Sequence, residues 1–325
     1  MLVAVTGGTG FLGGHVVAAL RRAGHSVRLL ARDAAAVPSD VDVVFGDVLN
    51  PGAVASAVRD ADAVLHAAGV YSFDSRRKSA MAAVNVEGTR IVLDAAASAD
   101  VGRVVHVSTF GALFAPGVRS VGPDSPVGRS RQPYLASKMA ADQLARSRQE
   151  RGEPVVIAYP PALLGPGDDR LGDQTTRLRA VLRGLTPIWP RGGFGVGDVR
   201  DNAEMAVSLL TAATPPARAF GPGEYVSTGE YLSALRSATG RGLPALRLPA
   251  ASLLPVGALA DLVQRLWPWQ IPVQLGAIIT CLRDTAIEAP PGRPFPDTVT
   301  DTVRWLHSRG LLTDRQAGTA ALVPA

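Results

Sequence analysis

The chain has 325 residues, of which 47% are hydrophobic and 19% charged, and its formal net charge is +5. This length and composition are typical of a globular enzyme with one dominant domain and a smaller lobe, and they exclude a disordered or fibrous chain. The 33 basic residues are scattered, so we expect no nucleic-acid partner, and no run of 18 uncharged apolar residues predicts a stable membrane span.

The single cysteine, Cys281, excludes an internal disulfide, and no cluster of Cys and His predicts a metal site. Met1 is followed directly by the apolar residues 2–5, without a basic segment before them. We therefore expect no signal peptide and a cytoplasmic protein.

In chain order, residues 1–160 alternate short apolar runs with longer helical patterns. Such alternation predicts an α/β fold, a Rossmann-type doubly wound parallel sheet that forms a dinucleotide-binding domain over residues 1–160. Strands are predicted over residues 2–6, 26–31, 41–45, 63–66, 104–107 and 155–159, and helices over residues 11–23, 52–59, 80–99 and 134–151.

After residue 160 the pattern changes, because Pro and Gly become frequent and helical segments alternate with short extended ones. This pattern predicts a smaller C-terminal α+β substrate lobe over residues 161–312, with some segments returning to the first domain. Residues 313–325 are rich in Ala, Gly and Thr and are expected to form a flexible tail. The helices predicted in the lobe span residues 199–212, 231–239, 250–267 and 298–309.

A glycine-rich turn joins the first predicted strand to the first predicted helix. Glycines allow a tight turn and a close approach of the backbone to a pyrophosphate, which then faces the helix N-terminus. The position between a strand and a helix favours a dinucleotide site over an ordinary turn. The residues predicted to contact the cofactor here are Gly7, Gly10, Phe11, Leu12 and Gly13.

The end of the second predicted strand distinguishes the two nicotinamide cofactors. An NAD site has a carboxylate there, whereas an NADP site has an arginine for the 2′-phosphate. Arg32 precedes Asp33 in this sequence, and the planar guanidinium fork suits a phosphate, so NADP(H) is favoured while NAD(H) stays open. Asp47 and Val48, after the third strand, are predicted to contact the adenine ring.

Only two of the 33 basic residues are lysines, Lys78 and Lys138. Lys138 follows Tyr134 by four residues, so the two side chains share one face of the predicted helix. A free phenol has a pKa of about 10, and a nearby cation favours the phenolate and lowers this pKa. The pair therefore predicts an acid/base unit.

The chain resembles the extended short-chain dehydrogenases/reductases over nearly its whole length. This branch includes nucleotide-sugar epimerases, dihydroflavonol reductases and 3β-hydroxysteroid dehydrogenases. The motifs that carry the resemblance, besides the glycine turn and the Tyr134–Lys138 pair, are Asp47-Val48, His66-Ala67-Ala68-Gly69, Asn85-Val86-Glu87-Gly88-Thr89, Val107-Ser108-Thr109, Pro160, Gly165-Pro166-Gly167-Asp168 and Asp198-Val199-Arg200-Asp201.

The resemblance implies a role for each matching residue. Tyr134 would exchange a proton with the substrate oxygen, and Lys138 would lower the Tyr134 pKa and bind the nicotinamide ribose. Relatives place the working hydroxyl 25 residues before the tyrosine, which selects Thr109 over Ser108. Asn85 would support the lysine through water.

Further positions that the resemblance assigns to the cofactor are Ala67, Gly69 and Pro160. Three positions depart from the family pattern: Tyr159, where an arginine is usual, Asn202, where an apolar residue is usual, and Pro133, where dihydroflavonol reductases carry a tryptophan.

Three functions remain open from the sequence. The first is an NADPH-dependent carbonyl reductase or alcohol dehydrogenase, with catalysis by Thr109, Tyr134 and Lys138, acting on a largely apolar ketone or aldehyde. The apolar residues of 250–283 favour such a substrate, although they also suit the lobe core, a homodimer face or a membrane-surface contact. The alternatives are a nucleotide-sugar epimerase with bound NAD, which would use Arg200, Arg283 and Arg293, and a non-catalytic NADP-sensing module.

Overall fold

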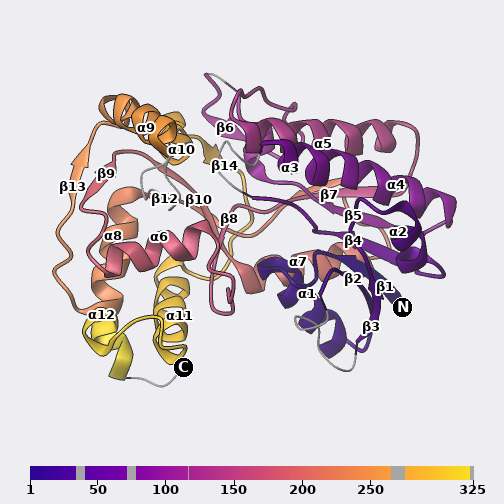
Figure 1. Ribbon diagram of the computed structural model, residues 1–325, viewed down its shortest axis with the longest axis horizontal. Helices are drawn as coiled ribbons and strands as arrows, with labels where there is room; N and C mark the ends of the chain where they lie inside the picture. Colours follow the sequence, from indigo (N-terminus) through magenta and orange to yellow (C-terminus); the bar gives the residue numbers. More distant parts are fainter. Residues whose placement is uncertain (34–40, 72–77, 116, 265–274, 323–325) are drawn as a thin grey trace.

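The computed structural model describes residues 1–33, 41–71, 78–115, 117–264 and 275–322. Two lobes lie side by side, with the N-terminus in the larger lobe and the C-terminal segment in the smaller one (Figure 1).

The larger lobe is built on a seven-stranded sheet in which every neighbouring pair of strands is parallel. The strand order is β11-β7-β5-β4-β1-β2-β3, which is the doubly wound order of dinucleotide-binding folds. The strands are β1 (Leu2–Thr6), β2 (Ser26–Ala31), β3 (Asp42–Phe45), β4 (Ala63–His66), β5 (Val104–Val107), β7 (Val155–Tyr159) and β11 (Arg218–Phe220).

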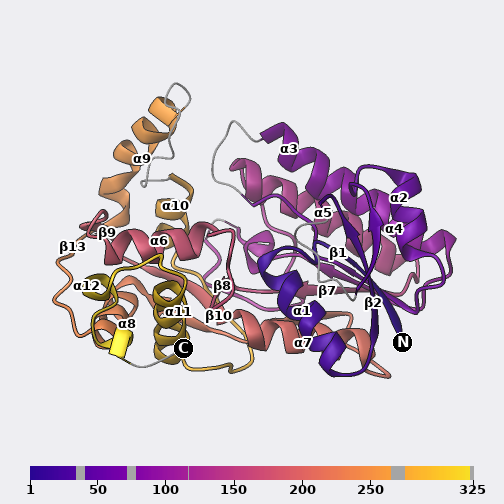
Figure 2. The same ribbon diagram turned by 60° about the horizontal axis from the view of Figure 1, so that its bottom comes forward.

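Helices cover both faces of this sheet (Figures 1 and 2). One face carries α1 (Phe11–Arg22) and α7 (Val199–Thr211), and the other carries α2 (Pro51–Val58), α4 (Gly88–Ser98) and α5 (Pro133–Glu150). Successive side chains of a strand point to opposite faces, so Val3 and Val5 join the core under α1 and α7, while Ala4 joins the other core. The predicted α/β fold with a Rossmann-type parallel sheet is confirmed.

The helix predicted over residues 80–99 is instead three segments. These are α3 (Lys78–Ala82), a π-helical turn η3 (Ala83–Glu87) and α4. A π-turn adds a residue without changing the apolar character of the buried face, so hydrophobic periodicity does not reveal it. Such turns are frequent at functional sites, and this one contains Asn85.

The smaller lobe contains a three-stranded sheet, β12-β10-β8, and the strand pair β13-β9, while a second pair, β14-β6, connects the lobes, with Val121 of β6 buried in the core of the larger lobe. The separate core of the smaller lobe includes Leu178, Phe194, Leu235 and Val303, all buried. These strands are β6 (Ser120–Val121), β8 (Ala162–Leu164), β9 (Ile188–Pro190), β10 (Gly193–Asp198), β12 (Glu224–Ser227), β13 (Leu246–Leu248) and β14 (Ala286–Ile287). The helices of the smaller lobe are α6 (Asp173–Leu182), α8 (Thr228–Thr239), α9 (Ala250–Gln264), α10 (Leu275–Arg283) and α11 (Phe295–Ser308). In the larger lobe, a 3₁₀ turn η4 (Phe110–Leu113) follows β5.

Two elements from the second half of the chain belong to the larger lobe. α7 packs on α1, and β11 pairs with β7 at the edge of the main sheet. The chain therefore passes from the larger lobe to the smaller one, back through α7 and β11, and out again.

The segment after residue 312 is packed against the smaller lobe, which differs from the flexible tail that the sequence predicts. It forms α12 (Asp314–Ala317) and a 3₁₀ turn η5 (Gly318–Leu322). Thr313 and Gln316 form a capping box that starts the helix, and Ala317 and Ala320 are buried in the lobe core. Small residues suit this close packing. Residues 323–325 lie outside the described chain.

The apolar segment 250–283 divides between surface and core. α9, which projects from the smaller lobe (Figure 2), exposes Val256, Leu259 and Val263, whereas Ile278 and Cys281 of α10 are buried. The last residues of the helix predicted over 250–267, together with Trp267, Trp269 and Ile271, lie outside the described residues. Among the helices that are described, none has the length and apolar character needed to cross a bilayer.

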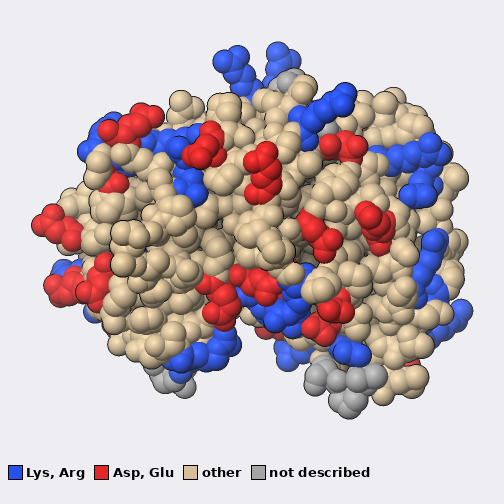
Figure 3. Space-filling view, turned by 180° about the vertical axis from the view of Figure 1, so that it is seen from behind, with Lys and Arg blue, Asp and Glu red and all other residues tan. Residues whose placement is uncertain are grey.

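The face seen in Figure 3 shows acidic and basic side chains interspersed over both lobes. This distribution corresponds to the scattered charges of the sequence.

Candidate active site

A cavity of about 380 Å³ lies between the lobes, where β1, β4, β5 and β7 end. Ligand sites of open α/β sheets lie at the carboxyl ends of the strands. The predicted site residues that line this cavity are Gly7, Gly10, Phe11, Leu12, Gly13, Ala67, Gly69, Asn85, Thr109, Tyr134, Lys138 and Pro160.

The glycine turn has no room for side chains, because its backbone packs closely on itself and on the segment after β4. Gly7 has a φ of +74°, and a Cβ there would lie 2.5 Å from the Ala68 nitrogen. A Cβ on Gly13 would lie 2.1 Å from the Gly7 carbonyl oxygen. Gly10, the N-cap of α1, provides no side-chain cap, and the first turn carries no acidic residue. The free N–H groups of this helix end suit a phosphate, so these residues fit a dinucleotide.

Thr109 and Tyr134 both line the cavity, and the Thr109 hydroxyl is close enough to the phenol to favour its ionised form. Thr109 follows β5 and is the N-cap of η4, where its hydroxyl oxygen also accepts from the Gly111 N–H at 3.3 Å. Tyr134 lies in the first turn of α5, which begins at Pro133. A proline with fixed φ suits this first helical position, which sets the direction of the following tyrosine.

The Ser108 hydroxyl takes part in a buried hydrogen-bonded cluster and is not part of the arrangement of Thr109 and Tyr134. Its hydroxyl donates to Asp142 Oδ1 at 2.9 Å. The other carboxylate oxygen of Asp142 accepts from Arg146 Nε at 2.9 Å and from the Tyr159 hydroxyl at 3.3 Å. Tyr159, which departs from the family pattern, therefore helps to fix α5 against β7. Because adjacent residues of an extended strand point to opposite sides, Thr109 faces Tyr134 while Ser108 does not.

Lys138 is buried one turn further along α5 and donates from Nζ to the Val107 carbonyl at 2.7 Å. Burial lowers the pKa of Lys138 to about 8, although the charge of Asp142 opposes this shift. The sequence predicts that Lys138 lowers the pKa of Tyr134. In the structure, burial instead raises the Tyr134 pKa; the nearby Thr109 hydroxyl opposes this, and the charge of Asp173 adds to it. The Lys138 ammonium is directed to the Val107 carbonyl, so the predicted lowering is absent here.

Asn85 fastens the segment after β4 to α5. Its Oδ1 accepts from the Val70 N–H at 2.7 Å, and its Nδ2 donates to the Val70 carbonyl at 3.0 Å and to Ser137 Oγ at 2.9 Å. The Ser137 hydroxyl in turn donates to the Tyr134 carbonyl at 2.7 Å. The π-helical turn thus carries a side chain that positions the helix of the tyrosine.

A buried chain of hydrogen bonds connects Asn85 to the strand before the glycine turn. The Thr89 hydroxyl donates to the Asn85 carbonyl at 2.7 Å, so its oxygen accepts from His66 Nε2 at 3.0 Å. His66 Nδ1 then accepts from the Thr6 hydroxyl at 2.8 Å, which assigns the neutral Nε2–H tautomer. Burial, and secondarily the charge of Lys138, lowers the pKa of His66 to about 3, which keeps this tautomer neutral.

Arg32, Asp47 and Val48 do not line the cavity. Arg32 follows β2 and lies 3.7 Å from Asp47, with 71% of its side chain exposed. Val48 is buried against Gly88, where it supports the start of α4. The two charged residues lie at the carboxyl edge of neighbouring strands, as the sequence predicts, and face solvent.

The smaller lobe contributes cavity residues that sequence reasoning missed. Asp173, Gln174 and Arg177 come from α6, and they line the cavity together with Tyr71, which follows β4. The Tyr71 ring stands edge-on to that of Tyr134, with centroids 4.6 Å apart. The sequence contains one indication of these α6 residues, the Gly-Pro-Gly-Asp turn shortly before α6, where the chain re-enters the smaller lobe. Much of the remaining wall is apolar: Phe110, Phe114, Leu135, Leu163 and Phe194.

A parallel sheet of this strand order, with a glycine turn after its first strand and a tyrosine–lysine pair in its cavity, is the architecture of NAD(P)-dependent enzymes. Residues 3–217 match the model of the NAD-dependent epimerase/dehydratase family. The chain belongs to this family, and its resemblance to the extended short-chain dehydrogenases/reductases is confirmed.

Reductases are similar to this chain in sequence, and an epimerase is similar to it in fold. The chain is 32% identical over 262 residues to a putative dihydroflavonol 4-reductase of Synechocystis sp., covering 75% of this chain and 74% of that one. It is 31% identical over 293 residues to the 2-alkyl-3-oxoalkanoate reductase of Stenotrophomonas maltophilia, covering 82% and 84%. The solved UDP-glucose 4-epimerase of Thermus thermophilus in complex with NAD has the same fold, with a TM-score of 0.69, 24% identity and coverage of 96% and 100%.

Proposed function

We propose that the protein is an NADPH-dependent reductase that converts a largely apolar ketone or aldehyde to an alcohol, and catalyses the reverse reaction. The observation that carries the proposal is the presence of Thr109, Tyr134 and Lys138 together in one cavity with a mostly apolar wall. The two reductases described above support a reaction at a carbonyl group.

In this proposal Tyr134 gives its phenolic proton to the carbonyl oxygen, and Thr109 holds that oxygen by a hydrogen bond. The raised pKa of Tyr134 keeps the phenol protonated before the reaction, as an acid requires. Lys138 holds the nicotinamide ribose through the donors of its ammonium group. The bound cofactor supplies the hydride that completes the reduction.

Two of the three arginines that a nucleotide-sugar epimerase would use are engaged in ion pairs outside the cavity, although another arginine of the smaller lobe, Arg177, does line it. Arg200 is paired with Asp198 at 2.6 Å and with Asp301 at 2.8 Å. Arg293 is paired with Asp201 at 2.9 Å. Neither arginine lines the cavity, so neither is placed to hold a substrate diphosphate there.

Replacing the proton donor tests the reaction. Tyr134→Phe is expected to lower kcat by about 10²- to 10⁴-fold, because it removes the general acid, while NADPH still binds. The measurement is NADPH oxidation with long-chain ketones and aldehydes, alongside NADPH binding by fluorescence. Thr109→Val should also lose activity, and Thr109→Ser, which keeps the hydroxyl, is the matched control. Undiminished turnover by Tyr134→Phe would overturn the proposal.

We further propose that Arg32 selects NADPH by holding the 2′-phosphate. Its exposed guanidinium, 3.7 Å from Asp47, is at the carboxyl end of β2, where this phosphate is recognised in the fold. Arg32→Ala should raise the Kd for NADPH by about tenfold or more and leave that for NADH nearly unchanged. Titration of both cofactors into both proteins measures this, and an equal change for the two would contradict it.

A further inference from the structure

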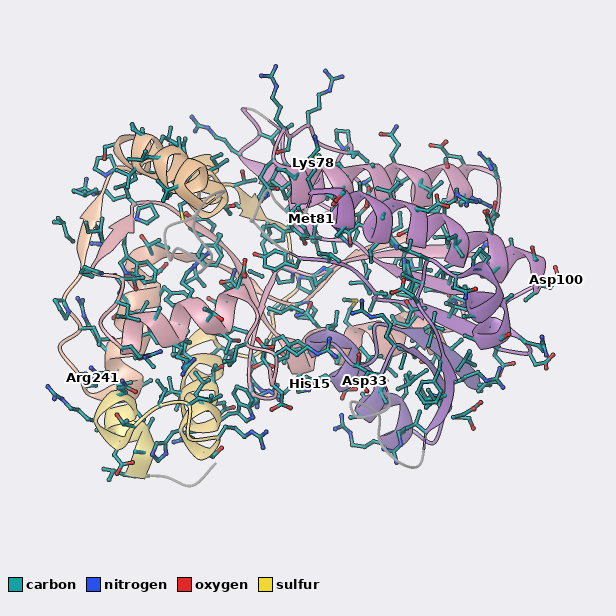
Figure 4. The ribbon with its side chains drawn as sticks, viewed as in Figure 1. His15, Asp33, Lys78, Met81, Asp100 and Arg241 are labelled. Carbon is teal, nitrogen blue, oxygen red and sulfur yellow. The ribbon has the colours of Figure 1, made fainter. Side chains whose placement is uncertain are left out.

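The loop of residues 165–172, which joins β8 to α6, leaves the smaller lobe and lies against the start of α1. We call it the crossing loop. His15 of α1 bonds through Nε2 to the Pro166 carbonyl at 3.0 Å, and Figure 4 places His15 beside this loop. A Cβ on Gly167, whose φ is +89°, would lie 3.0 Å from the same imidazole nitrogen. The loop is therefore in close contact with the helix that begins at the glycine turn.

Internal hydrogen bonds hold the crossing loop in one shape. Asp168 is buried, and its carboxylate accepts from the Gly172 N–H at 2.8 Å, while its carbonyl accepts from the Leu171 N–H at 2.9 Å. The Thr176 hydroxyl donates to the Leu171 carbonyl at 2.7 Å. Leu171 has a φ of +49°, a left-handed conformation that residues other than glycine rarely adopt. Such conformations persist where surrounding contacts enforce them, and they are concentrated at functional sites.

This shape directs Arg170 to the glycine turn. Its guanidinium donates to the Thr9 hydroxyl at 3.2 Å, and Thr9 immediately precedes Gly10, the N-cap of α1. Within the part of the chain that the structure describes, Arg170 makes no ion pair, and the adjacent Asp169 is paired with Arg309 at 3.2 Å. A guanidinium without a carboxylate partner therefore lies beside the uncapped N–H groups of the helix.

We propose that Arg170 holds the diphosphate of the dinucleotide from the side of the smaller lobe, opposite the N-terminus of α1. A planar guanidinium can bind two phosphate oxygens at once, and the helix end supplies donors from the other side. The site of the 2′-phosphate, by contrast, is marked by Arg32 after β2. The inference rests on the proposed function only in requiring that a nicotinamide dinucleotide binds.

Cofactor affinity tests the assignment without any substrate. Arg170→Gln should raise the Kd for NADPH and for NADH by the same factor, about tenfold to a hundredfold, because both contain the diphosphate. Arg170→Lys should recover part of the affinity, since it keeps the charge without the fork. Arg183→Gln is the matched control, because Arg183 follows α6 and is exposed like Arg170, but has no bond to the glycine turn among the described residues. Both Kd values should stay unchanged in this control, and thermal unfolding of each variant checks its folding.

Three results would overturn the assignment. If folded Arg170→Gln binds both dinucleotides with unchanged affinity, Arg170 does not contact the diphosphate. If the loss is confined to NADPH, Arg170 binds the 2′-phosphate instead. Failure of the wild-type protein to bind either dinucleotide would defeat both this inference and the proposed function. If the protein binds dinucleotides with an Arg170-dependent affinity but reduces no ketone or aldehyde, the proposed function fails and the assignment of Arg170 stands.

Discussion

Lys138 is a cation held in a place that disfavours its charge. Burial lowers its pKa from the ordinary 10.5 to about 8, and one of its N–H donors is directed to the Val107 carbonyl. An ammonium has three donors, so two remain for the ribose hydroxyls that we propose it binds. Arginine at this position would keep its charge through burial, but its rigid fork lacks the compact shape that this contact requires.

Lys138→Met is expected to stabilise the cofactor-free protein at pH 7 while abolishing activity. Because the folded pKa lies below the unfolded one, the unfolded chain binds more protons between pH 8 and 10.5, so wild-type stability rises with pH across that window. Below it the buried charge costs roughly 3 kcal/mol, partly offset by the bond to Val107, so the net gain should be about 1–2 kcal/mol. Urea unfolding at pH 7 and pH 10 measures both effects; a less stable variant at pH 7 would contradict the argument.

At the scale of elements, β4 and β5 place two buried histidines side by side. His66 and His106 are opposite one another in the parallel register, with ring centroids 5.4 Å apart. Both ring nitrogens of His66 are bonded, to Thr6 and Thr89, whereas those of His106 have no partner among the described residues. Burial, and then the charges of Lys138 and His66, lowers the pKa of His106.

Replacing each histidine by leucine should therefore have opposite effects. At pH 7, His106→Leu should be neutral or stabilising by about 1 kcal/mol, whereas His66→Leu should cost about 1–3 kcal/mol because it leaves two buried hydroxyls without their partner. Since the folded pKa of His106 is depressed, wild-type stability falls as the pH drops below about 6.5, and His106→Leu should weaken this fall. Denaturant unfolding from pH 5 to pH 8 tests both variants, and equal losses at pH 7 would refute the distinction.

The strands of the first 160 residues were predicted more accurately than the helices, whereas β11, at the edge of the main sheet, was not predicted. Five of the six strands predicted in the first 160 residues have the observed bounds, and the sixth begins one residue later, at Asp42. Strands buried on both faces form uninterrupted apolar runs between turn residues, so their ends are marked in the sequence. The π-helical turn around Asn85 and the packed segment after Thr313 depend on hydrogen bonds and contacts that no local pattern contains.

The residues of the cavity divide in the same way, into those that the local sequence predicts and those whose position depends on tertiary packing. The residues at strand ends, such as Gly7 and Thr109, could be placed because carboxyl ends of parallel strands meet at one edge. The position of Tyr71 against Tyr134, and of α6 across the cavity, depends on how the two lobes pack. Arg170 likewise reaches Thr9 across 161 residues of sequence.

For the whole molecule, cofactor binding should stabilise both lobes together. Residues of both line the cavity, and α7 and β11 tie the second half of the chain into the larger lobe. NADPH at a hundred times its Kd should add about 2.7 kcal/mol to the free energy of unfolding, which corresponds to a rise in Tm of roughly 5 °C. Scanning calorimetry should show one transition that shifts as a unit. Two transitions, of which only one moves, would contradict this coupling.

The return of the chain through α7 and β11 also affects how the protein is made. When residue 160 leaves the ribosome, the main sheet still lacks its edge strand and α1 lacks the helix that covers it. At about 5–20 residues per second, the roughly 60 residues up to Phe220 need about 3–12 s more. During that interval the nascent chain presents an apolar helix face and the unpaired edge of β7, which are the surfaces that chaperones protect.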